Sequence, residues 1–305
     1  MKRTNAITVT VHQDDRQVIS LSDEIRLLLK RYKVRPSKKF GQSFLNSNSI
    51  ARDIVKLAQV SSQDCVLEIG GGLGMLTRWI AAEAGEVHVV EVEPGLVKAL
   101  QDAAKGYNNV NVIEGDAMKV ELPEVNKVVA NLPYSISSEV TFRLLKELKF
   151  ETAVLMYQKE FASRMVAEPG TSEYSRLTVN VQYHADVELL MDVSADMFYP
   201  VPAVDSTVVK ITPRKEGQYA EDATIFHWMI RGIYPYPNKN IRRALQIWFR
   251  NLGHDKQLSQ EVLKRAEEYL KGGEKLRSLD RDTLIRIADV LLEMITDGLI
   301  IDPRV

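Results

Sequence analysis

The residues best suited to chemistry stand together in the segment Asn131-Leu132-Pro133-Tyr134. This segment follows an apolar run at 128–130 and precedes a helical pattern, which places it at the carboxyl end of a strand. The side-chain carbonyl of Asn131 and the backbone carbonyl of Leu132 can each accept one N–H of an exocyclic adenine amine. Pro133 stiffens the turn, and Tyr134 offers an aromatic face on which a base can stack. The pattern favours alkylation of an adenine N6 amine over an Asx-turn beside a core tyrosine.

A glycine-rich segment lies where an apolar strand is predicted to turn into a helix: Glu68-Ile69-Gly70-Gly71-Gly72-Leu73-Gly74. Glycines such as Gly70 and Gly72 allow a tight turn and a close approach of a ligand to backbone N–H groups. The dinucleotide fingerprint would need glycine at position 75, where this chain has Met75. The spacing therefore disfavours NAD and favours S-adenosyl-L-methionine as the cofactor.

Two acidic residues follow the next two predicted strands. Glu91 ends the second strand, where a carboxylate can accept both hydroxyls of a ribose. Asp116 follows the third strand, where it can accept a hydrogen bond from an adenine amino group. Each acid alone is more often an ordinary loop or cap residue. Because the ends of successive parallel strands meet at one edge of a sheet, the two acids and the glycine turn together favour a nucleoside-like ligand.

Strands and helices alternate from residue 64 to residue 157. Strands are predicted at 65–69, 87–91, 110–114, 127–130 and 152–157, and helices at 73–84, at 96–104 and after Ser135. This alternation predicts an α/β fold with a doubly wound, largely parallel, Rossmann-like sheet of the class I methyltransferase kind. After Pro213 the pattern becomes helical. We expect an N-terminal extension at 1–36 with a helix at 22–32, a methyltransferase domain at 37–214, and a small helical domain at 215–305 that is a candidate for RNA docking.

The composition limits the classes of function. The chain has 305 residues, of which 45% are hydrophobic, and a formal net charge of −1, so any nucleic-acid binding has to come from local clusters. Its one cysteine, Cys65, fits a reduced compartment. Neither a signal peptide nor a long apolar run is present, so we expect a cytoplasmic protein without membrane spans. The five histidines have no metal-like spacing, and no metal site is expected.

One basic cluster stands near the N-terminus. No acidic residue interrupts its seven basic positions, which are Arg26, Lys30, Arg31, Lys33, Arg35, Lys38 and Lys39. A solvated helix face is the usual explanation of such a run. Beside a site for adenine methylation, contact with RNA phosphates is the better interpretation.

Further motifs stand in a fixed order along the chain. They are Lys39-Phe40-Gly41-Gln42-Ser43-Phe44-Leu45, Gln158-Lys159-Glu160 with Arg164, Tyr174-Ser175-Arg176-Leu177 with Gln182-Tyr183, and Phe198-Tyr199-Pro200-Val201-Pro202-Ala203-Val204-Asp205-Ser206. With the glycine turn and residues 131–134, they make the sequence from about residue 38 to residue 213 resemble the KsgA-type small-subunit ribosomal RNA adenine N6,N6-dimethyltransferases. These are relatives of the erythromycin-resistance methyltransferases. The chain departs from the family pattern at Ser43, where Asn or His is usual, and at Gly71, where Pro is usual.

The resemblance implies that two methyl groups are transferred from S-adenosyl-L-methionine to each of two adjacent adenines near the 3′ end of small-subunit rRNA. The expected partner is this rRNA within a pre-assembled small ribosomal subunit, and we expect a monomer. Carried over by position, the cofactor-binding residues would be Gln42, Ser43, Leu45, Gly70, Gly72, Glu91, Asp116 and Asn131. The catalytic residues would be Asn131, Leu132, Pro133 and Tyr134, with Phe198 opposing Tyr134 across the target base.

Two alternatives compete with this hypothesis. An RNA-binding assembly factor with little catalysis would keep the fold, but intact Glu91, Asp116 and 131–134 argue against it. A DNA adenine methyltransferase can carry a similar catalytic segment, but the segments 40–42 and 198–206 favour the RNA family. The sequence does not separate mono- from dimethylation. Because extraction of a base from a duplex costs a few kcal/mol, we expect a loop or weakly stacked target.

Overall fold

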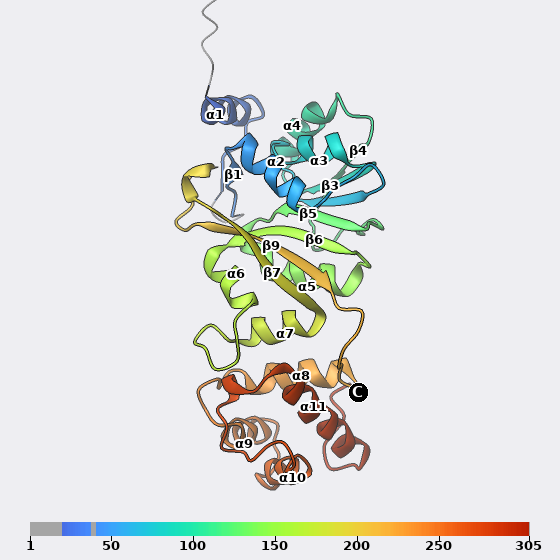
Figure 1. Ribbon diagram of the computed structural model, residues 1–305, viewed down its shortest axis with the longest axis vertical. Coiled ribbons are helices and arrows are strands. Elements are labelled where there is room, and N and C mark those ends of the chain that lie inside the picture. Colours follow the sequence, from blue (N-terminus) through green and yellow to red (C-terminus); the bar gives the residue numbers. More distant parts are fainter. Residues whose placement is uncertain (1–19, 38–40, 305) are drawn as a thin grey trace, which may run out of the picture.

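A central seven-stranded sheet carries helices on both faces, and a group of helices follows beyond it (Figure 1). The computed structural model describes residues 20–37 and 41–304. The strand order is β4-β3-β2-β5-β6-β9-β7. In chain order these strands are β2 (Cys65–Ile69), β3 (Glu86–Glu91), β4 (Val110–Glu114), β5 (Lys127–Asn131), β6 (Thr152–Gln158), β7 (Ala185–Val193) and β9 (Ser206–Pro213).

The strands from β4 to β6 are parallel to one another, as the sequence predicts. Their centres are short apolar runs such as Val128 and Val129, which are fully buried because helices cover both faces of the sheet. All five predicted strands are present, with bounds within one residue of the expected ones. Since parallel strands end at the same edge, the segments after β2, β3, β4 and β5 come together there.

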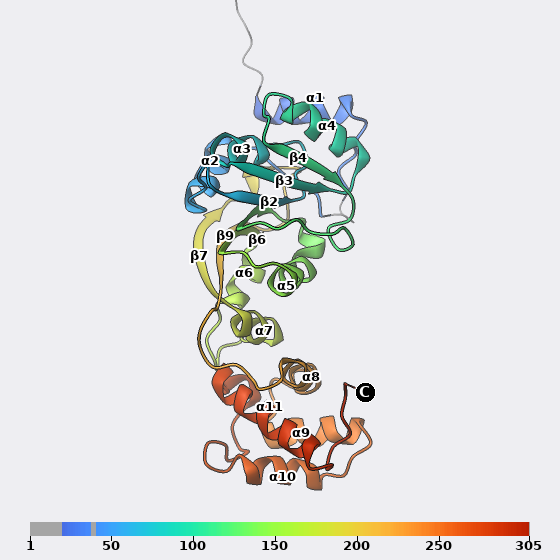
Figure 2. The ribbon, with the colours of Figure 1, turned by 90° about the vertical axis from the view of Figure 1, so that its right-hand side faces the viewer.

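Helices on the two faces of the sheet enclose two separate apolar cores (Figures 1 and 2). On one face lie α2 (Asn48–Leu57) and α3 (Thr77–Glu83), whereas α5 (Ser137–Glu147), α6 (Lys159–Met165) and α7 (Arg176–His184) cover the other. The helix α4 (Pro94–Ala104) connects β3 to β4. The helix expected from residue 73 begins only at Thr77, because the glycine turn occupies the residues before it. This arrangement is the expected doubly wound α/β fold.

The last two strands of the sheet run differently from the others. The strand β9 pairs antiparallel with both β6 and β7, and β7 contains a bulge between Leu189 and Met191. These strands were not among the expected elements. A separate two-stranded sheet joins β1 (Phe44–Leu45) to β8 (Phe198–Tyr199) in antiparallel register. This small sheet ties the segment before the first large strand to the segment before β9.

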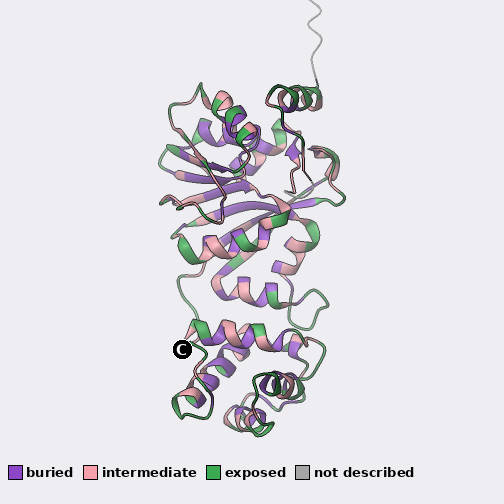
Figure 3. Ribbon diagram, turned by 180° about the vertical axis from the view of Figure 1, so that it is seen from behind, coloured by how far each residue is buried: buried purple, intermediate pink, exposed green. Residues whose placement is uncertain are grey.

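The helices after the sheet pack around a core of their own (Figures 2 and 3). They are α8 (Ala223–Ile233), α9 (Ile241–Asn251), α10 (Gln257–Arg265) and α11 (Arg281–Thr296). Trp248 and Phe249 are buried there. Val179 and Tyr183 of α7 belong to the same core, so this helical part packs directly on the last helix below the sheet.

At the other end of the molecule, the helix expected at 22–32 is α1 (Leu21–Arg31) (Figure 1). Ser20 caps it by accepting a hydrogen bond from the backbone N–H of Asp23. Residues 1–19 of the expected N-terminal extension lie outside the described residues. Among the helices that are described, none has the length and apolar character needed to cross a bilayer.

Candidate active site

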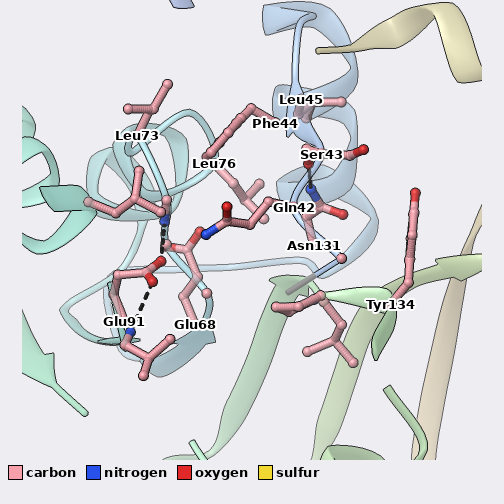
Figure 4. A pocket seen from close by; sticks show the side chains of 18 of the residues that line it. Gln42, Ser43, Phe44, Leu45, Glu68, Leu73, Leu76, Glu91, Asn131 and Tyr134 are labelled. Atoms are coloured by element: carbon pink, nitrogen blue, oxygen red, sulfur yellow. Dashed lines mark hydrogen bonds between the residues drawn. The ribbon is translucent and has the colours of Figure 1, made fainter. Parts of the chain in front are cut away.

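A cavity of about 230 Å³ opens at the carboxyl edge of the sheet, beside the ends of β2, β3 and β5 (Figure 4). It brings together nearly every residue expected from the sequence. Of the expected residues, those that line the cavity are Gln42, Ser43, Leu45, Gly70, Gly72, Glu91, Asp116, Asn131, Leu132, Pro133 and Tyr134.

The glycine turn forms one wall of the cavity in a conformation that favours glycine. Gly70 and Gly72 have φ angles of +77° and +58°. A Cβ atom on Gly70 would lie 3.2 Å from the ring of Pro133, and one on Gly72 would lie 3.3 Å from the ring of Phe44. The turn is therefore packed closely against the catalytic segment on one side and β1 on the other. This backbone cradle fits a nucleoside-like cofactor, because side chains at these positions would narrow it.

Glu91 stands at the end of β3 with its carboxylate held by the backbone. One oxygen accepts the N–H of Gly72 at 2.9 Å, and the other accepts those of Val92 and Glu93 at 2.9 and 3.0 Å (Figure 4). The side chain is buried, and this burial raises the pKa of the carboxyl group although the three backbone N–H groups lower it. The hydrogen bonds fix the position of the carboxylate at the cavity wall. Its remaining lone pairs can accept the two hydroxyls of a ribose.

Asn131 and Leu132 end β5 and begin the turn above it. The side-chain N–H of Asn131 donates to the backbone carbonyl of Ser43 at 3.2 Å, which leaves Oδ1 as the atom that can accept from a substrate (Figure 4). The side chain of Leu132 is buried in the core below the sheet edge, so the part of this residue that it offers to the cavity is its backbone. Asn131 and Leu132 both line the cavity, where the adenine hypothesis requires two carbonyl acceptors.

Tyr134 is fixed at its hydroxyl end. The hydroxyl group shares a 2.6 Å hydrogen bond with that of Ser206, which is fully buried at the start of β9. Burial raises the pKa of Tyr134, so the phenol remains neutral and its ring can serve as an apolar surface. Gly41, with φ +60°, lies over the same turn, and a Cβ atom there would stand 2.9 Å from the backbone nitrogens of Tyr134 and Ser135. Gly41 therefore allows its loop to close on the catalytic segment.

Asp116 lines the cavity from the loop after β4. One carboxylate oxygen accepts the N–H of Met118 at 2.9 Å, and the other lies 3.6 Å from the ammonium group of Lys119. Its side chain is 40% exposed, so it is the most accessible acid of the expected site. Gln42, on the opposite side, accepts the backbone N–H of Ser37 and thereby holds the loop that closes the cavity.

Phe198 is the exception among the expected residues. It does not line the cavity, and only 1% of the residue is exposed, because β8 pairs with β1 and directs its ring into the core between the sheet and α2. The expectation that it faces Tyr134 across a base is therefore not met by this structure. Its partner in register is Leu45, which is itself expected to bind the cofactor. In this arrangement Phe198 supports the wall of the cavity from behind.

Glu68 is a cavity residue that sequence reasoning did not single out. It precedes the glycine turn on β2 and lies in the cavity wall (Figure 4). It is 2% exposed and accepts a 2.6 Å hydrogen bond from the hydroxyl of Thr77. Burial raises the pKa of this carboxyl group from 4.5 to about 8, with the charge of Glu91 acting in the same direction. Its acidic character inside an otherwise apolar strand was the available signal.

We expect stability without cofactor to fall as pH rises from about 4.5 to about 8, because the folded state then holds the Glu68 proton that the unfolded chain has released. The substitution Glu68→Gln removes this loss. Its stabilisation relative to wild type should grow by up to about 1.4 kcal/mol per pH unit within that window. Thermal unfolding at several pH values measures it, with Glu83→Gln on the exposed end of α3 as the control. If the stabilities of the wild type and Glu68→Gln change with pH in parallel, the raised pKa of Glu68 is refuted.

The helix α1 supports the cavity from outside. Ile25, Leu29 and Val34 belong to one apolar cluster with Phe44, Leu73 and Leu96, and the last three line the cavity. The backbone of the glycine turn and the N-terminal helix are thus connected through a continuous set of packed side chains. The N-terminal segment, whose role the sequence did not reveal, therefore contributes to the shape of the cavity.

The substitution Ile25→Ala should lower the free energy of unfolding by about 2–4 kcal/mol, because it leaves a hole in a fully buried position. It should also weaken binding of S-adenosyl-L-methionine several-fold, since Phe44 and Leu96 lose their support. Chemical denaturation and calorimetric titration measure the two effects. Leu27→Ala on the same helix is the matched control, because Leu27 is 56% exposed. Equal affinities for Ile25→Ala and wild type would show that α1 does not shape the site.

The basic cluster lies partly on the outer side of α1. Arg26, Lys30, Arg31 and Lys33 are exposed, whereas Lys38 and Lys39 lie outside the described residues. Arg26 places its guanidinium 5.1 Å from the ring centre of Tyr199, the residue after Phe198. This contact joins the basic face of the helix to the small sheet β1–β8 that walls the cavity.

Comparison with known proteins agrees with this geometry. The model of the ribosomal RNA adenine dimethylase family matches residues 34–276. A probable ribosomal RNA small subunit methyltransferase A of Methanosarcina mazei is 45% identical over 221 residues, which are 72% of this chain and 81% of that relative. The relative of the same name in Methanococcoides burtonii is 39% identical over 270 residues, covering 88% of this chain and 98% of its own length.

Solved structures show the same fold. A dimethyladenosine transferase from Plasmodium falciparum superimposes with a TM-score of 0.70 at 29% identity, covering 84% of this chain and 98% of its own. The 23S rRNA methyltransferase ErmE gives a TM-score of 0.60 at 27% identity, and the match covers 81% of this chain and 99% of ErmE.

The fold and the site together define a class I methyltransferase that uses S-adenosyl-L-methionine. The chain belongs to the ribosomal RNA adenine dimethylase family. The adenine chemistry inferred from residues 131–134 is the chemistry of this family.

Proposed function

We propose that the protein dimethylates the N6 amines of two adjacent adenines near the 3′ end of small-subunit rRNA. The observation that carries this proposal is the orientation of Asn131, whose amide nitrogen is held by the carbonyl of Ser43. This contact reserves Oδ1 as an acceptor beside the backbone of Leu132. A pair of adjacent acceptors suits an exocyclic amine, which has two N–H groups to donate.

On the substrate side, the chain binds and orients the base. Oδ1 of Asn131 and the carbonyl of Leu132 accept the two N–H groups and keep the nitrogen lone pair directed into the cavity. Tyr134, fixed through Ser206, stacks on the extracted base with a contribution of about 1–3 kcal/mol. After the first transfer one N–H remains, so one acceptor is then sufficient. The amine becomes more acidic as it is alkylated and releases its proton to solvent, so no general base is required.

On the cofactor side, the residues present fit S-adenosyl-L-methionine. We propose that Glu91 accepts the ribose hydroxyls, that Asp116 accepts from the adenine amino group, and that the backbone of Gly70 and Gly72 contacts the ligand closely. Gln42, Ser43 and Leu45 close the cavity from the loop before α2. When bound, the cofactor supplies an electrophilic methyl group on a sulfonium. The buried, partly apolar walls exclude water from the reacting amine.

The RNA is expected to reach beyond the cavity. We propose that the exposed basic face of α1 contacts phosphates and that residues 215–305 form a separate domain that docks on the folded RNA. The proposed substrate is a pre-assembled small subunit, since two adjacent target bases have to be presented in a defined shape. We also propose that the protein acts as a monomer in the cytoplasm.

The test uses purified protein, labelled S-adenosyl-L-methionine and small ribosomal subunits that lack adenine methylation. Digestion to nucleosides should yield N6-methyladenosine early and N6,N6-dimethyladenosine at completion, with two modified adenines per subunit. Naked small-subunit rRNA serves as the comparison substrate and should react more slowly. If a known active dimethyltransferase modifies the same subunits and this protein yields no product, the proposal is wrong and an RNA-binding assembly factor becomes the better explanation.

A further inference from the structure

A second cluster of chemically active side chains lies at the opposite edge of the sheet from the cavity. Cys65 begins β2, and Glu86 begins the neighbouring strand β3, with His88 two residues further along. Cys65 pairs with Glu86 in the parallel register. Because residues two apart on a strand share a face, the three side chains project from the same face at the amino ends of β2 and β3.

The donor atoms of these side chains converge. Nε2 of His88 lies 3.1 Å from one carboxylate oxygen of Glu86, and Sγ of Cys65 lies 3.9 Å from the other. All three ligand atoms lie within 4.8 Å of one another. A tetrahedral zinc ion holds sulfur, nitrogen and oxygen donors about 3.3–3.7 Å apart. Small rotations close this gap, and Glu86 is free to make them because its side chain is 58% exposed.

We propose that Cys65, Glu86 and His88 form a zinc-binding site. A thiolate, an imidazole and a carboxylate are ligands that zinc combines, whereas magnesium and calcium prefer oxygen alone. The fourth position is left to water or to the backbone carbonyl of Glu124, which lies 3.6 Å from Sγ. Binding replaces the thiol proton of Cys65, which is released to solvent, and His88 binds through Nε2 as a neutral imidazole with its ring proton on Nδ1.

The surroundings hold these ligands in place. The backbone N–H of Cys65 donates to Asn126 at 2.8 Å, and the N–H of Glu86 donates to the carbonyl of Asp64 at 3.1 Å. The side-chain nitrogen of Asn111 lies 3.3 Å from Nδ1 of His88. A half-turn of this amide brings its oxygen to Nδ1–H and leaves Nε2 as the ligand atom, which is how outer residues commonly orient a metal-binding histidine. The site is thus built on two strands with fixed backbones.

Sequence spacing alone does not reveal this site. Cys65 and Glu86 are separated by the whole β2-α3-β3 unit, and only their register in the parallel sheet brings them together. The site is remote from the residues that bind the cofactor, so its occupancy and the methyltransferase reaction can be tested independently. A bound zinc ion would join β2 to β3 at their amino ends and stabilise the sheet by binding only the folded state.

The test is a titration of tag-free, metal-stripped protein with Co²⁺ and Zn²⁺. One equivalent of Co²⁺ should produce a thiolate-to-cobalt charge-transfer band, which one equivalent of Zn²⁺ should remove. Because Cys65 is the one cysteine in the chain, zinc should also slow the reaction of the protein with a thiol reagent at least tenfold. Saturating zinc should raise Tm by about 5 °C.

Cys65→Ser and His88→Gln should each abolish the charge-transfer band and the zinc-dependent rise in Tm. His254→Gln and Glu114→Gln, which change exposed or partly exposed side chains elsewhere, should leave both intact. Circular dichroism and Tm in metal-free buffer establish that each variant is folded. The absence of a charge-transfer band in the wild type, or zinc binding unchanged in Cys65→Ser, would overturn the proposal and leave the cluster as a surface ion pair between His88 and Glu86.

Discussion

Asn131→Ala is expected to lower the rate of methyl transfer by about 1,000-fold, the largest effect of any single substitution in this chain. Loss of one preorganised hydrogen-bonding group at a reacting centre typically costs two to three orders of magnitude. Here the loss also frees the amine to rotate away from the direction of attack, since the carbonyl of Leu132 alone fixes one N–H. Single-turnover assays on unmethylated small subunits, with labelled S-adenosyl-L-methionine, measure the rate directly.

The same variant should bind the cofactor with an affinity within about fivefold of the wild type, because the proposed ribose contacts of Glu91 are retained. Ser43→Ala is the matched control. It keeps the backbone carbonyl that holds the Asn131 amide and loses only the 3.1 Å contact of its hydroxyl with Pro200. With saturating S-adenosyl-L-methionine, turnover of Ser43→Ala should stay within about threefold of the wild type, because the proposed role of Ser43 is in cofactor binding and not in positioning the amine. If Asn131→Ala retains a tenth or more of wild-type turnover, its side chain is not the acceptor that positions the amine.

The parts of the site that the sequence predicts correctly are those set by local pattern. Apolar runs of three to five residues, such as those inside β5 and β6, are long enough to form the centre of a buried strand and too short for helices, so the strand ends can be located from composition alone. The residues just after those ends then meet at one edge by topology. This is why the sequence predicts that Glu91, Asp116 and residues 131–134 lie together, as they do around the cavity.

Long-range register is what the sequence could not supply. The residues of β7 are largely exposed, so this strand lacks the apolar pattern of the parallel ones. β9 has buried Val208, Val209 and Ile211, but its antiparallel pairing with β6 and β7 is long-range and not encoded by a local pattern. The orientation of Phe198 depends on a two-residue pairing with β1, which no local pattern encodes. The role of Glu68 depends equally on packing: an acid inside the apolar strand β2 is a local signal, but its burial follows only from the elements packed around it.

Glu91→Ala should have the largest effect on the cofactor, weakening its affinity by about 100-fold. Two hydrogen bonds from ribose hydroxyls to a charged acceptor are lost, each worth about 1.5–3 kcal/mol before water compensates in part. The backbone N–H groups of Gly72, Val92 and Glu93 also lose their shared acceptor. Because they lie near a buried position, we expect a loss of about 2 kcal/mol in stability as well. Calorimetric titration and chemical denaturation separate the two effects.

Glu114→Ala is the matched control for Glu91→Ala, because the two glutamates are partners in register at the ends of neighbouring strands. Glu114 is exposed and does not belong to the cavity wall. Its removal should therefore change the cofactor affinity by less than about twofold and the free energy of unfolding by less than about 0.5 kcal/mol. Glu91→Gln keeps one oxygen for the backbone N–H groups, but its amide NH₂ group faces hydrogen-bond donors. Its affinity for the cofactor should therefore lie between those of the wild type and Glu91→Ala. Equal losses for Glu91→Ala and Glu114→Ala would mean that the net charge of this edge binds the cofactor. If only Glu91→Ala loses cofactor affinity, the cofactor must make a directed contact with this carboxylate, which its hydrogen bonds hold in a fixed position.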